Sequence, residues 1–209
     1  MLALSLKKNR NFTYVNLKLP KKIDHNKCRI KIHYSAICAS DIPRAYFNQS
    51  YFYPLILGHE FSGKVVEYGK NVKDIKLGQR VSVFPLIPKC KKCENCKKKK
   101  FNLCQNYSYY GSRENGSFCQ FIDVYKWNIH KIHNKLTLQM ASLLEPTAVA
   151  FNVYEKIKIK HKMNILFIGA GFISQVLLRI LSLNKNLKIT VADRNNFKLR
   201  LAKKCTSNI

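Results

Sequence analysis

Hydrophobic and polar positions change their spacing near residue 150 of this 209-residue chain. Before that point, short alternating or apolar runs are separated by Gly, Pro and Asn, which is typical of short β-strands joined by turns. The expected strands are the first six residues and residues 29–34, 63–67, 80–83 and 118–124. Several short strands at this spacing predict a β-barrel or a distorted sheet.

From residue 148 onward, the pattern indicates alternating helices and strands. The expected elements are a helix over 148–156, a strand over 164–168, a helix over 173–181, a strand over 187–192 and a helix over 197–204. The wholly apolar run Ile165–Ile168 is typical of a buried parallel strand. This order is that of the opening of a doubly wound fold. We therefore predict a mixed α/β chain with two domains, residues 1–150 and 151–209.

The composition bears on whether the chain binds nucleic acid or a membrane. The chain carries 38 basic and 11 acidic residues, a formal charge of +27. The lysines are spread along the whole chain, so we interpret the charge as compositional and do not expect nucleic-acid binding as the main role. No run of 18 apolar residues exists, and the short apolar start is followed at once by lysines, so we expect no membrane span and no export signal. A cytoplasmic protein is expected.

Four of the eight cysteines fall within one short segment. Cys90, Cys93, Cys96 and Cys104 have the spacing C-x2-C-x2-C-x7-C. Closed sites of four thiolates are typical of structural zinc. Iron–sulfur clusters also use closely spaced cysteines, but no further cluster signal is present. The segment therefore predicts a structural zinc site.

A second set of motifs precedes this segment. Gly58-His59-Glu60 begins the pattern G-H-E-x2-G-x5-G-x2-V, and Cys38-Ala39-Ser40-Asp41 lies about twenty residues earlier. Together with the four-cysteine segment and a glycine-rich segment near residue 169, these motifs resemble the zinc-containing medium-chain alcohol and polyol dehydrogenases. The resemblance covers nearly the whole chain in the family's order. It implies a GroES-like β-barrel catalytic domain followed by the first part of a Rossmann domain that binds NAD.

The resemblance also implies roles for particular residues. A catalytic zinc would be held by Cys38, His59 and Glu145, with Glu60 as a further ligand or an exchanging partner. A metal site of this kind keeps one position open for water or substrate, and the metal acts on the alcohol oxygen as a Lewis acid.

Two residues next to Cys38 take roles from the same resemblance. Ser40 would accept the substrate proton into a relay, and Asp41 would orient a zinc-bound imidazole. Some alcohol dehydrogenases place a relay His a few residues further on, where this chain has Pro43. The relay would then continue through water or cofactor hydroxyls.

The glycine-rich segment predicts how the cofactor binds. Gly169 and Gly171 begin a G-x-G-x-x-S pattern that includes Ile173, with Ser174 where Gly or Ala is preferred. The first glycine permits a tight turn and the second lets a pyrophosphate approach the helix N-terminus. Asp193 follows 24 residues after Gly169, at the end of the next expected strand, where it would accept hydrogen bonds from the ribose hydroxyls. This arrangement favours NAD over NADP.

The substrate expectation rests on closer resemblance within the family. The segments around Cys38, His59 and Gly111-Ser112-Arg113 look most like those of galactitol-1-phosphate dehydrogenases, with sorbitol dehydrogenases as near relatives. We therefore expect a polyol phosphate, such as galactitol 1-phosphate, as the small-molecule substrate. Arg44 and Arg113 are candidates to bind its phosphate, since guanidinium groups suit phosphate oxygens.

The chain contains only two strands of the expected Rossmann domain. Both zinc sites should still form, because their ligands all precede residue 150, but we expect weak or no turnover. A homo-oligomer or a partner chain could supply the remaining half. The alternative is an inactive zinc-binding remnant or interaction module of the same family.

Overall fold

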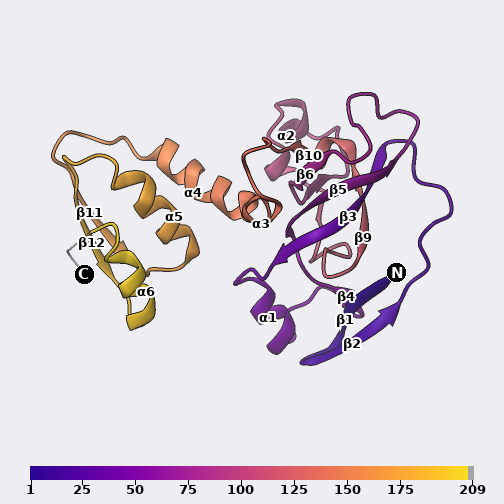
Figure 1. Ribbon diagram of the computed structural model, residues 1–209, viewed down its shortest axis with the longest axis horizontal. Helices are drawn as coiled ribbons and strands as arrows, with labels where there is room; N and C mark the ends of the chain where they lie inside the picture. The colour runs from indigo at the N-terminus through magenta and orange to yellow at the C-terminus, as the bar shows by residue number, and fades with distance from the viewer. Residues whose placement is uncertain (207–209) are drawn as a thin grey trace. The chain divides into compact units, whose positions relative to one another are not determined.

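The computed structural model describes residues 1–206, which form two compact units (Figure 1). The first unit is Met1–Glu145 and the second begins at Pro146. Each unit has its own apolar core among the described residues.

A five-stranded antiparallel sheet forms the centre of the first unit, with strand order β10-β6-β5-β3-β9 (Figure 1). Its strands are β3 (Lys27–Ala36), β5 (Glu60–Tyr68), β6 (Arg80–Val83), β9 (Phe121–Tyr125) and β10 (Ile129–Lys131). The core beneath the sheet includes the fully buried Ile30, Phe61, Val65, Val81 and Val124. Apolar packing among residues between Cys28 and Val124 thus holds the sheet.

Two smaller antiparallel sheets complete this unit. The first joins β1 (Leu2–Lys8), β2 (Asn11–Asn16) and β4 (Leu55–Ile56), and the second joins β7 (Leu86–Pro88) and β8 (Tyr107–Tyr109). The helical segments are short: α1 (Asp41–Tyr46), α2 (Glu94–Lys97) and α3 (Leu138–Ala141), with 3-10 turns over Phe101–Leu103 and Lys126–Asn128.

One predicted strand is shorter than the sequence indicated. The strand expected over 118–124 begins only at Phe121. The backbone N–H of Phe118 donates to the carbonyl of Leu57, and its carbonyl accepts from Leu4, so this residue is tied to the β1 and β4 region instead of β3. Alternation alone could not predict that the segment changes its partner strand.

The second unit has the predicted order of helices and strands. Its elements are α4 (Leu144–Lys156), β11 (Asn164–Ile168), α5 (Phe172–Leu181), β12 (Lys188–Ala192) and α6 (Asn196–Ala202). The two strands pair in parallel, with Asn164 opposite Lys188 and Ile168 opposite Ala192. α4 begins four residues earlier than predicted, because Pro146 fits the first turn of a helix, where its missing N–H has no helical partner. The mixed α/β prediction is confirmed.

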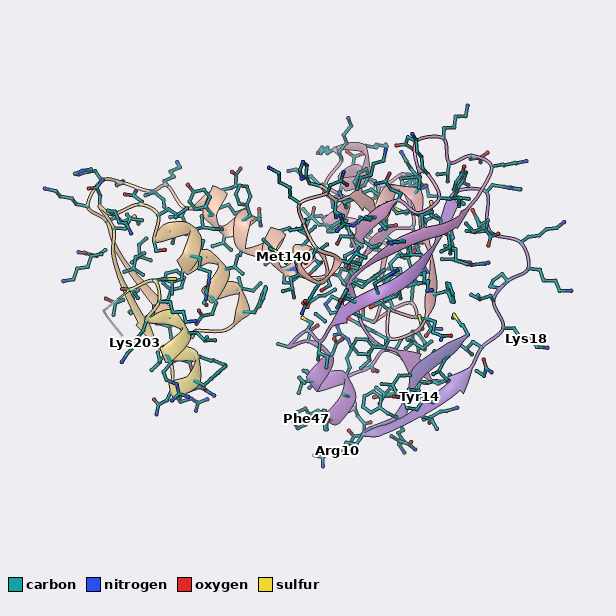
Figure 2. The ribbon with its side chains drawn as sticks, in the orientation of Figure 1. Arg10, Tyr14, Lys18, Phe47, Met140 and Lys203 are labelled. Atoms are coloured by element: carbon teal, nitrogen blue, oxygen red, sulfur yellow. The ribbon has the colours of Figure 1, made fainter. Side chains whose placement is uncertain are left out.

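The surface reflects the basic composition. Lys18 in the first unit and Lys203 in the second both extend away from the ribbon, as Figure 2 shows. Within residues 1–206, no helix is both long and apolar enough to cross a membrane.

Candidate metal centres and cofactor loop

The four predicted cysteines of the short segment come together. Their sulfur atoms all lie within 4.8 Å of one another. The Cys90 Sγ lies 3.8 Å from that of Cys96 and 3.3 Å from that of Cys104. Four sulfurs at about 2.3 Å from one tetrahedral ion would be about 3.8 Å apart, so the cluster is close to zinc geometry without a disulfide.

Backbone N–H groups and burial give these four thiols different pKa values. N–H groups of Cys93 and Lys92 point at the Cys90 sulfur and lower its pKa to about 6. Burial raises the pKa of Cys96 to about 12. A cation would therefore meet one thiol that ionises readily near neutral pH and another that loses its proton only when the positive charge stabilises the thiolate.

A second cluster consists of Cys38, His59 and Glu60, whose ligand atoms also lie within 4.8 Å of one another. It depends on the pairing of β3 with β5, in which Ala36 stands opposite Glu60. Cys38 follows β3 by two residues, so the pairing brings it beside the His-Glu pair. His59 and Glu60 are buried, each about 5% exposed.

A glycine turn directs His59 into this cluster. Gly58 has a φ of +94°, a conformation that favours glycine. A Cβ at Gly116 would lie 2.0 Å from the Gly58 carbonyl oxygen, and a Cβ at Gly58 would lie 2.6 Å from Phe118 and Ser117. The backbone at Gly58 and Gly116 is therefore packed too closely for any side chain.

Asp41 lies behind His59. One carboxylate oxygen accepts from the Cys38 N–H at 3.1 Å, and the other lies 3.7 Å from the His59 Nδ1. Burial raises the pKa of Asp41 to about 6 and lowers the pKa of His59 to about 4. His59 is thus a neutral imidazole at neutral pH, which is the form that binds metal. A neutral imidazole, a thiol and a carboxylate gathered in one buried cluster suit a zinc ion.

Glu145 lies outside this three-residue cluster, although the family resemblance implied that it is a ligand. Its carboxylate accepts a 2.8 Å hydrogen bond from the phenol of Tyr109. The Tyr109 ring in turn stands edge-on to the imidazole of His59, with ring centres 5.6 Å apart. Sequence reasoning missed Tyr109, because only the pairing of β7 with β8 places it here and no motif contains it.

The proton-relay and phosphate candidates are already engaged by the protein. The Ser40 hydroxyl accepts a hydrogen bond from Arg44 at 3.0 Å. Arg113 lies between the rings of Tyr51 and Tyr107, with its guanidinium carbon 4.1 and 4.6 Å from their centres. Both arginines are therefore held in fixed positions and not extended freely into solvent.

The glycine-rich turn of the second unit has the predicted conformation. Gly169 has a φ of +97°, and Gly171 immediately precedes α5. No atom lies within 4 Å of a Cβ built at Gly171, so space is open there for a ligand. Ile173 lies in the first turn of α5. One Asp193 oxygen accepts from the Ala170 N–H at 2.7 Å, and this hydrogen bond lowers the pKa of Asp193.

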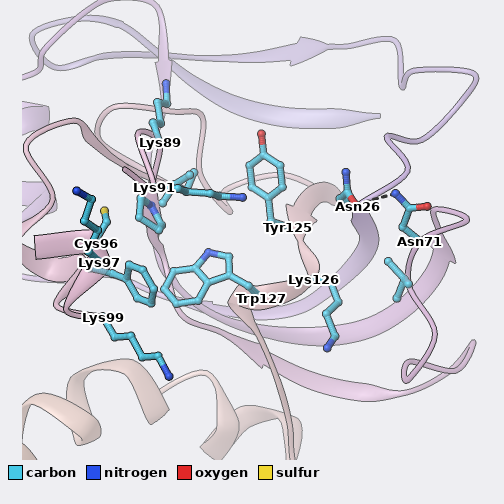
Figure 3. A pocket seen from close by; sticks show the side chains of 14 residues that line it. Asn26, Asn71, Lys89, Lys91, Cys96, Lys97, Lys99, Tyr125, Lys126 and Trp127 are labelled. Carbon is cyan, nitrogen blue, oxygen red and sulfur yellow. Dashed lines mark hydrogen bonds between the residues drawn. The ribbon is translucent and has the colours of Figure 1, made fainter. Parts of the chain in front are cut away.

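A groove of about 910 Å³ lies beside the four-cysteine segment (Figure 3). Its walls include aromatic side chains and lysines: Phe101, Tyr125, Trp127, Lys89, Lys91, Lys97, Lys99 and Lys126. Three of these lysines form ion pairs, Lys89 with Glu114, Lys97 with Glu94 and Lys126 with Asp74. Cys38, His59 and Glu60 do not line the groove, so it is separate from the second metal cluster.

Comparison with known proteins identifies the family. Residues 24–134 match the family described as the alcohol dehydrogenase GroES-like domain. The chain belongs to this family. The matched residues contain both metal clusters, and the relatives are zinc-dependent polyol and alcohol dehydrogenases.

Individual relatives share both sequence and fold. The chain is 31% identical over 185 residues to galactitol 1-phosphate 5-dehydrogenase of Escherichia coli K12, covering 88% of this chain and 53% of that protein. It is 33% identical over 201 residues to D-arabitol-phosphate dehydrogenase of Enterococcus avium, covering 94% and 56%. A solved alcohol dehydrogenase from E. coli CFT073, complexed with NADH, has a TM-score of 0.89 at 28% identity and covers all of this chain and 61% of that one. The chain thus spans little more than half the length of these relatives.

Proposed function

We propose that this chain provides the zinc-binding catalytic part of an NAD-dependent dehydrogenase that oxidises a phosphorylated sugar alcohol. The proposed reaction converts galactitol 1-phosphate, or a closely related polyol phosphate, to a keto-sugar phosphate. The observation that carries the proposal is the buried cluster of Cys38, His59 and Glu60 with Asp41 behind the imidazole. The names of the two curated relatives support a phosphorylated polyol.

Each residue of the cluster has a proposed task. Cys38, His59 and Glu60 would hold a zinc ion, with Glu145 as a further ligand, and Asp41 would fix the orientation of His59. When bound, the metal supplies Lewis-acid polarisation of the substrate's alcohol oxygen. Ser40, two residues from Cys38, would accept the hydroxyl proton and pass its own proton on to water or to a cofactor hydroxyl. Its hydrogen bond from Arg44 keeps the Ser40 oxygen in place.

The second unit would bind the cofactor. Gly171 and the N-terminal N–H groups of α5 would receive the pyrophosphate, with Ile173 beside them and Gly169 making the turn. Asp193 would accept from the ribose hydroxyls, which favours NAD. NAD, when bound, would supply the hydride acceptor for the alcohol carbon. The NADH complex of a solved relative supports this proposal.

The four-cysteine cluster would hold a second, structural zinc ion. Its four thiolates would complete the coordination, so no position remains for a substrate. A homo-oligomer or a partner chain, predicted from the sequence, remains part of the proposal. β11 leaves Leu166 and Ile168 60% and 87% exposed, which supports a search for such an assembly by mass measurement in solution.

A cobalt-substitution experiment tests this function without depending on turnover. With zinc kept at the four-cysteine site, cobalt is placed at the second site, and galactitol 1-phosphate is added with and without NADH. We expect the visible cobalt bands to change with the polyol phosphate and NADH to bind. An unchanged spectrum at saturating polyol phosphate would count against a polyol substrate. A cobalt spectrum insensitive to His59→Ala would contradict the site itself.

A further inference from the structure

The Tyr109 side chain connects two predicted zinc ligands that lie 86 residues apart in the sequence. Its hydroxyl donates to Glu145 at 2.8 Å, and its ring packs edge-on against His59 at 5.6 Å between ring centres. The residue itself ends β8, so a strand fixes its backbone. One side chain therefore contacts both the residue before β5 and the first turn of α4.

The contact gives the Glu145 carboxylate a hydrogen-bond donor. The Glu145 side chain is partly buried, and one of its carboxylate oxygens lies 2.8 Å from the Tyr109 hydroxyl. A buried carboxylate without a hydrogen-bond donor is costly. The phenol supplies a donor to one oxygen of Glu145 and leaves the other oxygen free for a cation.

We propose that Tyr109 is a positioning residue, which holds the Glu145 carboxylate at the edge of the Cys38, His59 and Glu60 cluster so that it completes the metal site. This inference rests on the proposed function, because it requires a metal at that cluster. Ligating carboxylates are commonly held by such outer hydrogen bonds, and losing one typically weakens metal binding by about 10–100-fold. Tyr109 contacts Glu145 and His59 and would act through them.

The chain offers a well-matched control. Tyr110, the next residue, is buried and packs in the apolar core with Ile30 and Val124, whereas Tyr109 is partly buried. Tyr110→Phe removes the same atom as Tyr109→Phe at a position away from the metal cluster. Glu145→Gln keeps an oxygen that can accept from Tyr109 but removes a strong metal ligand.

The test measures cobalt affinity and the visible cobalt spectrum at the second site, with zinc kept at the four-cysteine site. We expect Tyr109→Phe to weaken cobalt binding by about 10–100-fold and to alter the spectrum. Tyr110→Phe should do neither. In a chain that already carries Glu145→Gln, Tyr109→Phe should have no further effect, since it acts through that carboxylate. The melting temperatures of the metal-free variants check that each one folds.

Three outcomes would overturn the inference. Unchanged affinity and spectrum in Tyr109→Phe would show that the phenol does not position a ligand. Multiplying losses in the double variant would show that Tyr109 acts independently of Glu145. Equal weakening by Tyr110→Phe would indicate general destabilisation. A wild-type chain that binds no cobalt at this cluster would instead contradict the proposed function, which separates the two failures.

Discussion

The two candidate metal clusters are built in opposite ways. The four-cysteine cluster is local, because all its sulfurs come from residues 90–104 and their backbone turns bring them together. The cluster of Cys38, His59 and Glu60 requires β3 to pair with β5 in the correct register. A local site of this kind depends on the metal for its shape, whereas a long-range site is shaped by the core that surrounds it.

The largest effect should come from breaking the local cluster. Cys96→Ser should remove one zinc ion per chain and unfold the surrounding segment, since structural zinc sites bind with roughly 10–16 kcal/mol. Exposed lysines fill this segment, among them Lys91 and Lys97–Lys100, so limited trypsin digestion reports its unfolding directly. Cys119→Ser, in a cysteine outside both clusters, is the control and should change neither result. A Cys96→Ser chain as resistant to trypsin as the wild type would contradict a metal-dependent segment.

Breaking the long-range cluster should leave the fold intact. His59→Ala should weaken zinc binding at the second site by more than the roughly 10–100-fold cost of losing an outer hydrogen bond. The core residues Phe61, Val65 and Val81 do not depend on the metal, so the four-cysteine segment should remain resistant to trypsin. Zinc titration and digestion of the same preparation check both statements. Loss of both zinc ions would indicate that the two sites are coupled.

The same contrast explains what the sequence could predict. The cysteine spacing and the G-x-G turn are local, and the structure places these residues together as expected. The family resemblance supplied Cys38, His59 and Glu60 jointly, since no local pattern relates Cys38 to His59. The sequence could not predict a role for Tyr109, because its position beside Glu145 follows from strand pairing and side-chain direction. For the same reason, the sequence could not predict that Glu145 would be bound to a phenol.

Two glycines of the cofactor loop, Gly169 and Gly171, should respond differently to substitution by alanine. Gly171→Ala should leave stability nearly unchanged, because nothing lies within 4 Å of the added Cβ, but it should fill the space that a pyrophosphate needs. Gly169→Ala should lower stability by about 1–3 kcal/mol, since Gly169 has a φ of +97°, which L side chains rarely adopt. Calorimetric NADH titration and thermal melts of both variants check this. Wild-type NADH affinity in Gly171→Ala would contradict the proposed cofactor site.

A smaller effect should distinguish the two arginines from one another. If Arg113 binds the substrate phosphate, Arg113→Ala should weaken binding of galactitol 1-phosphate by about tenfold, the cost of a hydrogen bond to a charged group, and spare free galactitol. Arg44→Ala should affect both ligands if it mainly holds Ser40. Competition titrations at the cobalt-loaded site measure these affinities. Equal losses for both ligands in Arg113→Ala would remove its phosphate role.

The smallest expected effect is on the pH dependence of the stability of the metal-free chain, through His59 and the neighbouring Asp41. The depressed pKa of His59, about 4, makes stability rise with pH between about 4 and the ordinary value of 6.5. The raised pKa of Asp41, about 6, makes stability fall with pH between its ordinary value of 3.8 and about 6. Asp41→Asn removes the second contribution, so its melting temperature should rise with pH more steeply than that of the wild type. Parallel pH profiles would contradict these opposing contributions.

Counting zinc in the purified chain tests the central claim most directly. Elemental analysis should find two zinc ions in the wild type, and one in each of Cys96→Ser and His59→Ala. That result would establish one independent metal site in each cluster. Fewer than one zinc ion per wild-type chain, or a count that His59→Ala leaves at two, would contradict the proposal that each cluster holds one zinc ion.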